Sequence, residues 1–163
     1  MRGPLLFGWA QNNLHKELDE QLGTEDETVA TEKQVKRLPY LNASINEGLH
    51  LHSTSSLGLP GVAPEGGLMV MEKYFPAGTV LSVPSYTIHR DDRIWGDDVE
   101  SFRPERWFER DPSDIQKTFN PFSTGPRCAN TRLVKNSHTS CRACIGRNLA
   151  FLELQIIIGS IIR

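Results

Sequence analysis

The residues best suited to chemistry lie in one stretch, residues 125–150, which reads GPRCANTRLVKNSHTSCRACIGRNLA. It holds all three cysteines of the chain, Cys128, Cys141 and Cys144, together with His138. Thiolates and imidazoles bind metal ions, and a pair of thiols can carry redox chemistry. The stretch could therefore be a metal site, a redox pair, or a loop that holds a cofactor.

Two of these interpretations meet difficulties of spacing. A zinc site would use Cys128, His138, Cys141 and Cys144, but the order Cys-x9-His-x2-Cys-x2-Cys matches no common zinc frame. A redox pair at Cys141 and Cys144 would need a strand before it, where the sequence has a basic loop. Zinc binding stays open as the weaker alternative, and chance accounts better for the cysteine pair.

The third interpretation emerges when residues 128–142 are left out of the loop. The remainder reads Phe122-x-x-Gly125-x-Arg127-x-Cys144-x-Gly146. This pattern resembles the haem-ligand loop of the cytochrome P450 monooxygenases. The resemblance makes Cys144 the thiolate ligand of the haem iron and Arg127 the partner of a haem propionate, with Phe122, Gly125 and Gly146 as further cofactor-binding residues. A thiolate just before a helix is also stabilised by the free N–H groups of that helix.

Other segments support the same family. Glu47-Gly-Leu-His50 lies where the family has Glu-x-x-Arg, and Arg106 in Phe102-Arg-Pro-Glu-Arg-Trp107 resembles the arginine that completes a buried ion network with that glutamate. His89, in Ile88-His-Arg-Asp91, resembles the residue that reaches the second propionate. The amino-acid sequences of several loops are most similar to those of the fungal benzoate 4-monooxygenase branch. The resemblance implies a haem-thiolate monooxygenase that hydroxylates a small aromatic acid, with a NADPH-cytochrome reductase as partner.

The chain departs from the family in the structural network of Glu47, His50 and Arg106. His50 replaces an arginine, and histidine is shorter and nearly neutral at pH 7. We therefore expect the carboxylate of Glu47 to be left half-paired, at a cost of about 3–5 kcal/mol.

The second departure is the segment 128–142, which separates Arg127 from Cys144. It is polar and basic and has neither a helical nor a strand period. Fifteen codons preserve the reading frame, so we interpret it as an inserted loop from a retained intron. Cys128 directly follows Arg127 and is a rival ligand, but no x-Gly and no apolar helix come after it.

The elements that would position these residues can be predicted from periodicity. We expect helices over 12–22, from Pro39 to before Ser53, and over 145–162, and strands over 68–71 and 79–83 in a small antiparallel sheet. The segment 91–119 shows no sustained period, and Trp95, Trp107 and Phe108 are expected in the core. The predicted fold is mainly α with a small antiparallel β-sheet: one partial domain, residues 1–163, equal to the C-terminal part of the cytochrome P450 fold.

Composition limits the remaining functions. The chain has 163 residues, a net charge of −2 and scattered basic residues, which excludes nucleic-acid binding. It shows no apolar run that could cross a membrane, so it is expected to be soluble or peripheral as written, whereas the full-length family is expected at the endoplasmic reticulum membrane. The long helix that the family places over the haem is not found in the sequence. A non-catalytic, truncated remnant is therefore the alternative to an active enzyme.

Overall fold

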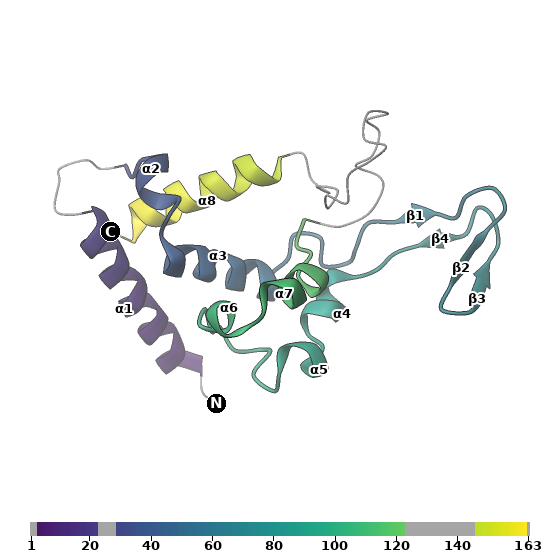
Figure 1. Cartoon of the computed structure of the whole chain (residues 1–163), viewed down its shortest axis with the longest axis horizontal. Coiled ribbons are helices and arrows are strands. Elements are labelled where there is room, and N and C mark those ends of the chain that lie inside the picture. Colours follow the sequence, from purple (N-terminus) through teal and green to yellow (C-terminus); the bar gives the residue numbers. More distant parts are fainter. Residues whose placement is uncertain (1–2, 23–28, 123–145, 163) are drawn as a thin grey trace.

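The computed structural model describes residues 3–22, 29–122 and 146–162. Its helices are α1 (Gly3–Leu22), α2 (Glu32–Val35), α3 (Pro39–Leu51), α4 (Ser85–His89), α5 (Asp92–Trp95), α6 (Arg106–Glu109), α7 (Pro112–Thr118) and α8 (Arg147–Ile161). Its strands are β1 (Gly61–Val62), β2 (Leu68–Val70), β3 (Lys73–Phe75) and β4 (Val80–Leu81). Figure 1 shows α1, α2, α3 and α8 gathered at one end, the short helices α4 to α7 beside α3, and the strands in an arm on the other side.

The apolar core lies where α1, α2, α3 and α8 meet. Leu18 of α1, Val35 of α2 and Leu41 of α3 are fully buried and belong to one cluster. Gly159 brings α8 close to this cluster, because a Cβ atom at that position would lie 3.0 Å from Cγ1 of Val35. Ser160 then accepts a hydrogen bond from the backbone N–H of Ala30 at 3.0 Å. This hydrogen bond joins residues 130 positions apart, so α8 is packed against elements from the beginning of the chain.

A carboxylate of α1 fixes the start of α3. The side chain of Glu17 accepts hydrogen bonds from the backbone N–H groups of Tyr40, at 2.7 Å, and Leu41, at 2.8 Å. Pro39, at the first helical position, has no N–H to satisfy. Negative charge at a helix N-terminus is favourable because the unpaired N–H groups carry partial positive charge. Glu17 therefore caps α3 from a neighbouring helix and sets the angle at which α3 enters the core.

The strands form two separate antiparallel pairs. β1 pairs with β4 and β2 pairs with β3. The prediction of strands at 68–71 and 79–83 is confirmed within a residue or two, but these two strands do not pair with each other. β2 pairs with β3 across a two-residue turn, whereas β4 pairs with β1 across residues 63–79, which contain that hairpin. Met71 and Glu72 make the turn between β2 and β3 with φ angles of 45° and 64°, as a two-residue hairpin turn requires.

The three predicted helix ends and two of the three predicted starts hold within two residues. The first helix ends at Leu22 as predicted but begins at Gly3 rather than at residue 12. The segment 91–119, where no period was visible, contains the short helices α5, α6 and α7. Phe108 is 56% exposed, so its predicted place in the core is wrong, whereas Trp95 is buried. None of the described helices combines the length and apolar character that crossing a membrane requires.

Candidate functional site

The centre of the candidate site is the buried carboxylate of Glu47, in the middle of α3. Its oxygen Oε1 accepts hydrogen bonds from the Nε of Arg106, at 3.0 Å, and from the backbone N–H of Arg103, at 2.9 Å. Its oxygen Oε2 accepts one from the indole N–H of Trp107 at 3.0 Å. The expectation of a half-paired carboxylate is therefore wrong, because a backbone amide and an indole supply donors beside the guanidinium.

The guanidinium of Arg106 is held just as completely. It is 1% exposed, and besides Glu47 it donates to the carbonyl oxygens of Trp95, Asp98 and Ser101 and to the carboxylate of Asp98. Those carbonyls belong to the turn between α5 and α6, where the backbone would otherwise have unpaired acceptors. The ion pair thus joins α3 to the segment that contains α5 and α6, since Glu47 and Arg106 are 59 positions apart in the sequence.

His50 lies one helical turn after Glu47 and is also buried. Its Nδ1 is 3.6 Å from Oε2 of Glu47, too long for a hydrogen bond, and neither ring nitrogen makes one in the described part of the chain. The ring is instead enclosed by aromatic neighbours: its centroid lies 4.2 Å from that of Trp95 and 5.6 Å from that of His89. His50 therefore packs as an aromatic residue and contributes little to the pairing of Glu47.

Burial moves the pKa values of these groups away from their ordinary range. Burial raises the pKa of Glu47 above 4.5, and the donors from Arg103 and Arg106 oppose that rise. Burial lowers the pKa of His50 to about 3, assisted by the positive charge of Arg106. The pKa of His89 is lowered as well, again because of burial. Both histidines are therefore neutral at pH 7, and the protonated form of either would be an unpaired buried cation.

His89 ends α4 and faces the same aromatic cluster. It is fully buried, its Nε2 accepts a hydrogen bond from the backbone N–H of Asn120 at 3.2 Å, and its ring centroid lies 5.4 Å from that of Phe119. Its Nδ1 has no hydrogen-bond partner in the described residues. The predicted contact with a haem propionate stays a prediction, since the structure places His89 within the protein interior.

The two ends of the predicted haem loop lie near each other. Phe122 ends one described stretch, and the guanidinium of Arg147, the first residue of α8, lies over its ring at 5.5 Å from the centroid. Gly146 occupies the cap position just before α8, with φ −83° and ψ −1°. Gly125, Arg127 and Cys144, with the rival residues Cys128, His138 and Cys141, lie outside the described residues. Their predicted roles as cofactor or zinc ligands stay predictions.

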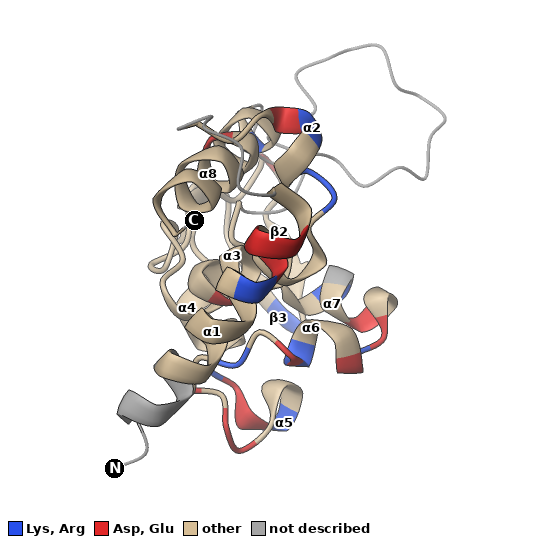
Figure 2. Cartoon of the chain, turned by 90° about the vertical axis from the view of Figure 1, so that its left-hand side faces the viewer, with Lys and Arg blue, Asp and Glu red and all other residues tan. Residues whose placement is uncertain are grey.

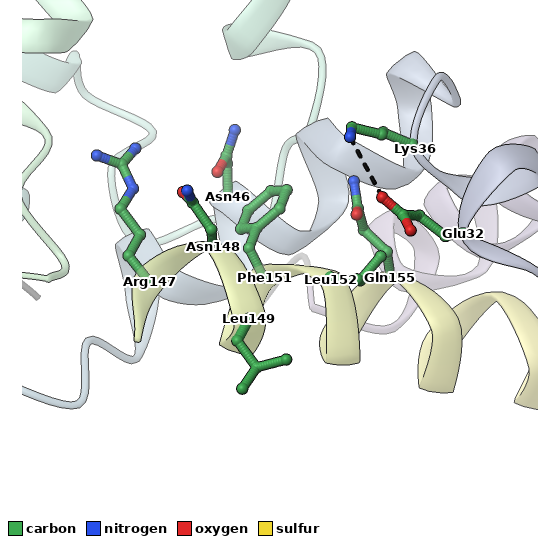
Figure 3. A pocket seen from close by; sticks show the side chains of 9 residues that line it. All are labelled: Glu32, Lys36, Asn46, Arg147, Asn148, Leu149, Phe151, Leu152 and Gln155. Carbon is green, nitrogen blue, oxygen red and sulfur yellow. Dashed lines mark hydrogen bonds and ion pairs between the residues drawn. The ribbon is translucent and has the colours of Figure 1, made fainter. Parts of the chain in front are cut away.

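A cleft of about 740 Å³ opens beside the first half of α8. Figure 3 shows Arg147 and Asn148 of α8 pointing to the same side as Asn46 of α3, while Leu149, which also lines the cleft, points to the opposite side of α8. Lys36 and Glu32 of α2 form an ion pair at 3.3 Å on its far wall. The cleft therefore lies between three of the core helices and next to the residue where α8 begins.

Charges of both signs are mixed over the described helices. Figure 2 shows acidic and basic residues close together on α1 and α2 and around α5 to α7, without a continuous basic face in that view. This distribution agrees with the net charge of −2.

The described residues are mainly helical with small two-stranded sheets and a buried glutamate–arginine pair, and an apolar helix follows the segment of the sequence that contains the cysteines. These features are those expected of part of a haem-thiolate domain. Compared with protein-family models, residues 9–131 match the family "Cytochrome P450". The chain belongs to the cytochrome P450 family. Members of this family hold a haem iron through a cysteine thiolate.

Curated relatives are fungal monooxygenases. The chain is 44% identical over 153 residues to "Benzoate 4-monooxygenase bphA" of Aspergillus niger, which covers 92% of this chain and 26% of the relative. It is 36% identical over 152 residues to "Cytochrome P450 monooxygenase atr2" of Stereocaulon alpinum, covering 92% of this chain and 26% of that relative. It is 33% identical over 132 residues to "Cytochrome P450 monooxygenase hepC" of Aspergillus oryzae, covering 80% and 23%. The chain thus spans about a quarter of the length of these relatives.

Sequence reasoning missed several partners of the buried pair. Trp107 and Arg103 complete the hydrogen bonds of Glu47, and Asp98 completes those of Arg106. The role of Trp107 as a donor to Glu47 could have been suspected from its position directly after Arg106 in the sequence. No sequence signal identifies the backbone N–H of Arg103 as a donor, because every residue except proline carries the same group.

Proposed function

We propose that this chain supplies the haem-ligand part of a haem-thiolate monooxygenase that hydroxylates a small aromatic acid. The observation that carries the proposal is the buried pair of Glu47 and Arg106, found in a chain 44% identical to a benzoate 4-monooxygenase over 92% of its length. A buried ion pair needs hydrogen bonds that replace those to water, and the segment from Trp95 to Ser101 accepts four from Arg106 besides the one to Glu47. The pair thus holds α3 in a fixed position against the segment that contains α5 and α6.

The residues near the predicted ligand fit a haem. Cys144 lies three positions before Arg147, where α8 begins, so its thiolate would lie close to the unpaired N–H groups of a 15-residue helix. These groups and the helix dipole favour the thiolate over the thiol. Arg127 would neutralise a propionate, and Gly125 and Gly146 would let the backbone approach the porphyrin. When bound, a thiolate-ligated haem supplies the activation of O2 that monooxygenation needs.

The substrate and the redox partner are inferred from the relatives. The printed name of the Aspergillus niger relative identifies benzoate as its substrate, so a small aromatic carboxylic acid is the substrate class proposed here. Electrons for the reaction would come from a NADPH-cytochrome reductase at the endoplasmic reticulum membrane.

The segment 128–142 is proposed to be a retained intron. Its removal brings Arg127 to the family spacing of two positions from Cys144, whereas the present spacing is 17 positions. The family-model match ends at residue 131, inside this segment. Sequencing the spliced transcript across codons 126–144 tests the proposal. A mature message that still encodes residues 128–142 would contradict it.

The function itself can be tested by spectroscopy. The chain without residues 128–142 would be co-expressed with the part of the Aspergillus niger relative that lies outside the match, in the presence of haem. We expect the reduced, CO-bound protein to show the red-shifted Soret band of a thiolate ligand, and Cys144→Ser to abolish that band. The shortened chain lacks Cys128, so the matched control is made in the chain with all 163 residues. There, Cys128→Ser should take up as much haem as the unchanged 163-residue chain.

Two other outcomes would overturn the proposal. If no haem is taken up although the polypeptides fold, the chain is a non-catalytic remnant. If metal analysis finds zinc, and Cys144→Ser and Cys128→Ser both remove it, the cysteine cluster is a zinc module instead.

A further inference from the structure

The imidazole of His89 holds the backbone of a segment that lies far from it in the sequence. Its Nε2 accepts a hydrogen bond from the N–H of Asn120 at 3.2 Å, across 31 positions. The next carbonyl oxygen, that of Pro121, accepts a longer bond from the hydroxyl of Ser53 at 3.5 Å. Phe122, the first residue of the predicted haem loop, follows directly. His89 therefore joins the end of α4 to the approach to that loop.

The bond from Asn120 fixes the protonation state that this arrangement requires. An amide N–H can only donate, so the Nε2 of His89 must offer a free lone pair. The proton of the neutral ring is then on Nδ1, which makes no hydrogen bond within the described residues. A second proton would go to Nε2 and point at the hydrogen of the Asn120 amide. Protonation thus replaces a donor–acceptor contact with a contact between two donors.

The described side chains that enclose His89 offer no negative charge to an imidazolium. From α3, the ring of His50 lies 5.6 Å away between centroids, and neither of its nitrogens makes a hydrogen bond in the described part of the chain. Trp95 of α5 and Phe119 lie at 6.1 and 5.4 Å between centroids and are uncharged. Arg90, the residue after His89, is positive and disfavours a second cation. A protonated His89 would therefore be a buried cation without a partner.

The carboxylate of Glu47 does not supply the missing charge either. It lies 3.6 Å from the Nδ1 of His50, but its oxygens already accept hydrogen bonds from Arg106, from the backbone of Arg103 and from the indole of Trp107. The positive charge of Arg106 acts against protonation of His50. The two histidines thus share an interior whose acidic group is matched by an arginine.

We infer that His89 is an acid-sensitive latch: it holds the backbone of Asn120 when its ring is neutral and releases it when its ring is protonated. Because the released segment leads to Phe122, acid would loosen the approach to the predicted haem loop. The latch consists of residues of this chain alone, so its operation does not depend on the proposed haem ligation or on monooxygenation.

The direction of the pH dependence follows from the pKa of His89. Burial lowers this pKa below 6.5 and the charge of Arg90 lowers it further, whereas the backbone of His50 and the side chain of Asn120 oppose the shift without reversing it. A released ring has the ordinary pKa of 6.5 and binds a proton more readily than the latched ring. The latch is therefore fully closed above pH 6.5 and opens as the pH falls below that value.

Hydrogen exchange of single amides, measured by NMR on the full chain without haem, tests the latch. Between about pH 7 and about pH 5, we expect the protection factor of the Asn120 amide, which corrects for the intrinsic pH dependence of exchange, to fall about five- to thirtyfold. The amide of Ile45, in the middle of α3, reports global unfolding and should stay better protected than that of Asn120 at both pH values.

Three variants separate the latch from a general effect of acid. His89→Gln keeps an acceptor for the Asn120 amide but cannot be protonated, so its Asn120 protection should change less than about twofold over the same pH range. His50→Gln should keep the fall, because Asn120 donates to His89 and not to His50. His52→Gln, at an exposed histidine, is the matched control and should behave as the unchanged chain.

A titration of the unchanged chain keeps the test decisive if His89→Gln does not fold. The ring signals of His89 and the amide signal of Asn120 should then change together, with one midpoint below pH 6.5. Protonation of His89 with unchanged protection of Asn120 would overturn the inference. So would equal protection of Asn120 and Ile45 at the lower pH, because the whole chain would then open, and so would an undiminished acid effect in a folded His89→Gln. No haem is present, so none of these results bears on the proposed haem ligation.

Discussion

The buried network around Glu47 and the β arm, residues 57–83, use their side chains in opposite ways. In the network, charged groups are fully enclosed and each is supplied with donors or acceptors from the chain itself. In the arm, apolar groups stand in solvent, and Met71 at its tip is 95% exposed. Polar residues are thus inside and apolar residues outside, the reverse of the usual distribution.

The difference shows which part of the haem frame is complete within this chain. A buried ion pair is tolerated only when its hydrogen bonds are made, and the turn between α5 and α6 makes them for Arg106. An exposed apolar strand is tolerated only until a partner covers it. Residues of this chain therefore complete the network, whereas Val62 of β1 and Val80 of β4 are uncovered in the part of the chain that the structure describes.

The largest effect should come from breaking the network. Glu47→Ala would remove the buried counter-charge of the Arg106 guanidinium, which is 1% exposed, and leave only the partly exposed carboxylate of Asp98. We expect the free energy of unfolding to fall by about 3–5 kcal/mol, which is enough to unfold a domain of this size. Urea denaturation followed by circular dichroism would measure it. Glu20→Ala, at a glutamate whose side chain is 61% exposed, is the control and should change the free energy by less than about 0.5 kcal/mol.

Acid should weaken the same network through its histidine. The folded-state pKa of His50 is about 3, below its unfolded value of 6.5, so the unfolded chain binds the proton first as the pH falls. The stability contributed by neutral His50 is complete above pH 6.5 and is lost towards pH 3, at up to about 1.4 kcal/mol per pH unit.

The variant His50→Gln isolates this contribution. Glu47 and His89 also titrate abnormally, and the raised pKa of Glu47 acts in the opposite direction, but both are present in the two proteins compared. Between pH 6.5 and pH 4.5 we expect the unfolding free energy of the unchanged chain to fall more steeply than that of His50→Gln. Parallel curves would show that the ring of His50 is not neutral and buried.

A smaller effect is expected at the cap of α3, which positions the network. Glu17→Ala removes the acceptor for the N–H groups of Tyr40 and Leu41. The loss of a helix cap costs about 1 kcal/mol. Thermal unfolding would show a lower midpoint than for the unchanged chain. A midpoint equal to that of Glu20→Ala would indicate that α3 starts correctly without the carboxylate.

The smallest effect on stability is expected in the arm. Val62→Ser with Val80→Ser should change the unfolding free energy of the chain alone by less than about 0.5 kcal/mol, because both side chains are already in solvent. Urea denaturation of the isolated chain measures this directly. A loss of more than about 1 kcal/mol would mean that these two side chains are packed on other residues of the chain.

Much of the helical core was readable from the sequence, because a four-residue apolar repeat predicts a buried helix face. Leu14, Leu18 and Leu22 show this repeat and all are buried. The beginning of α1 was missed because residues 3–11 lack that repeat. The pairing of the strands was also missed, since short strands contain no register information beyond their turns.

The network was only partly predictable. Resemblance to the family brought Glu47 and Arg106 together in advance, but the histidine at position 50 led to an expectation of weak pairing. That expectation failed because the N–H of Arg103 and the indole of Trp107 replace the missing donor. A backbone donor depends on how the chain turns before α6, and no local residue pattern encodes that geometry.

Hydrogen exchange of the isolated chain tests the contrast most directly. We predict that amides of α3 around Glu47 exchange only through global unfolding, while those of β1 and β4 exchange through local opening orders of magnitude faster. Equal protection of α3 and of β1 and β4 would contradict the account, because the two regions would then be packed equally firmly.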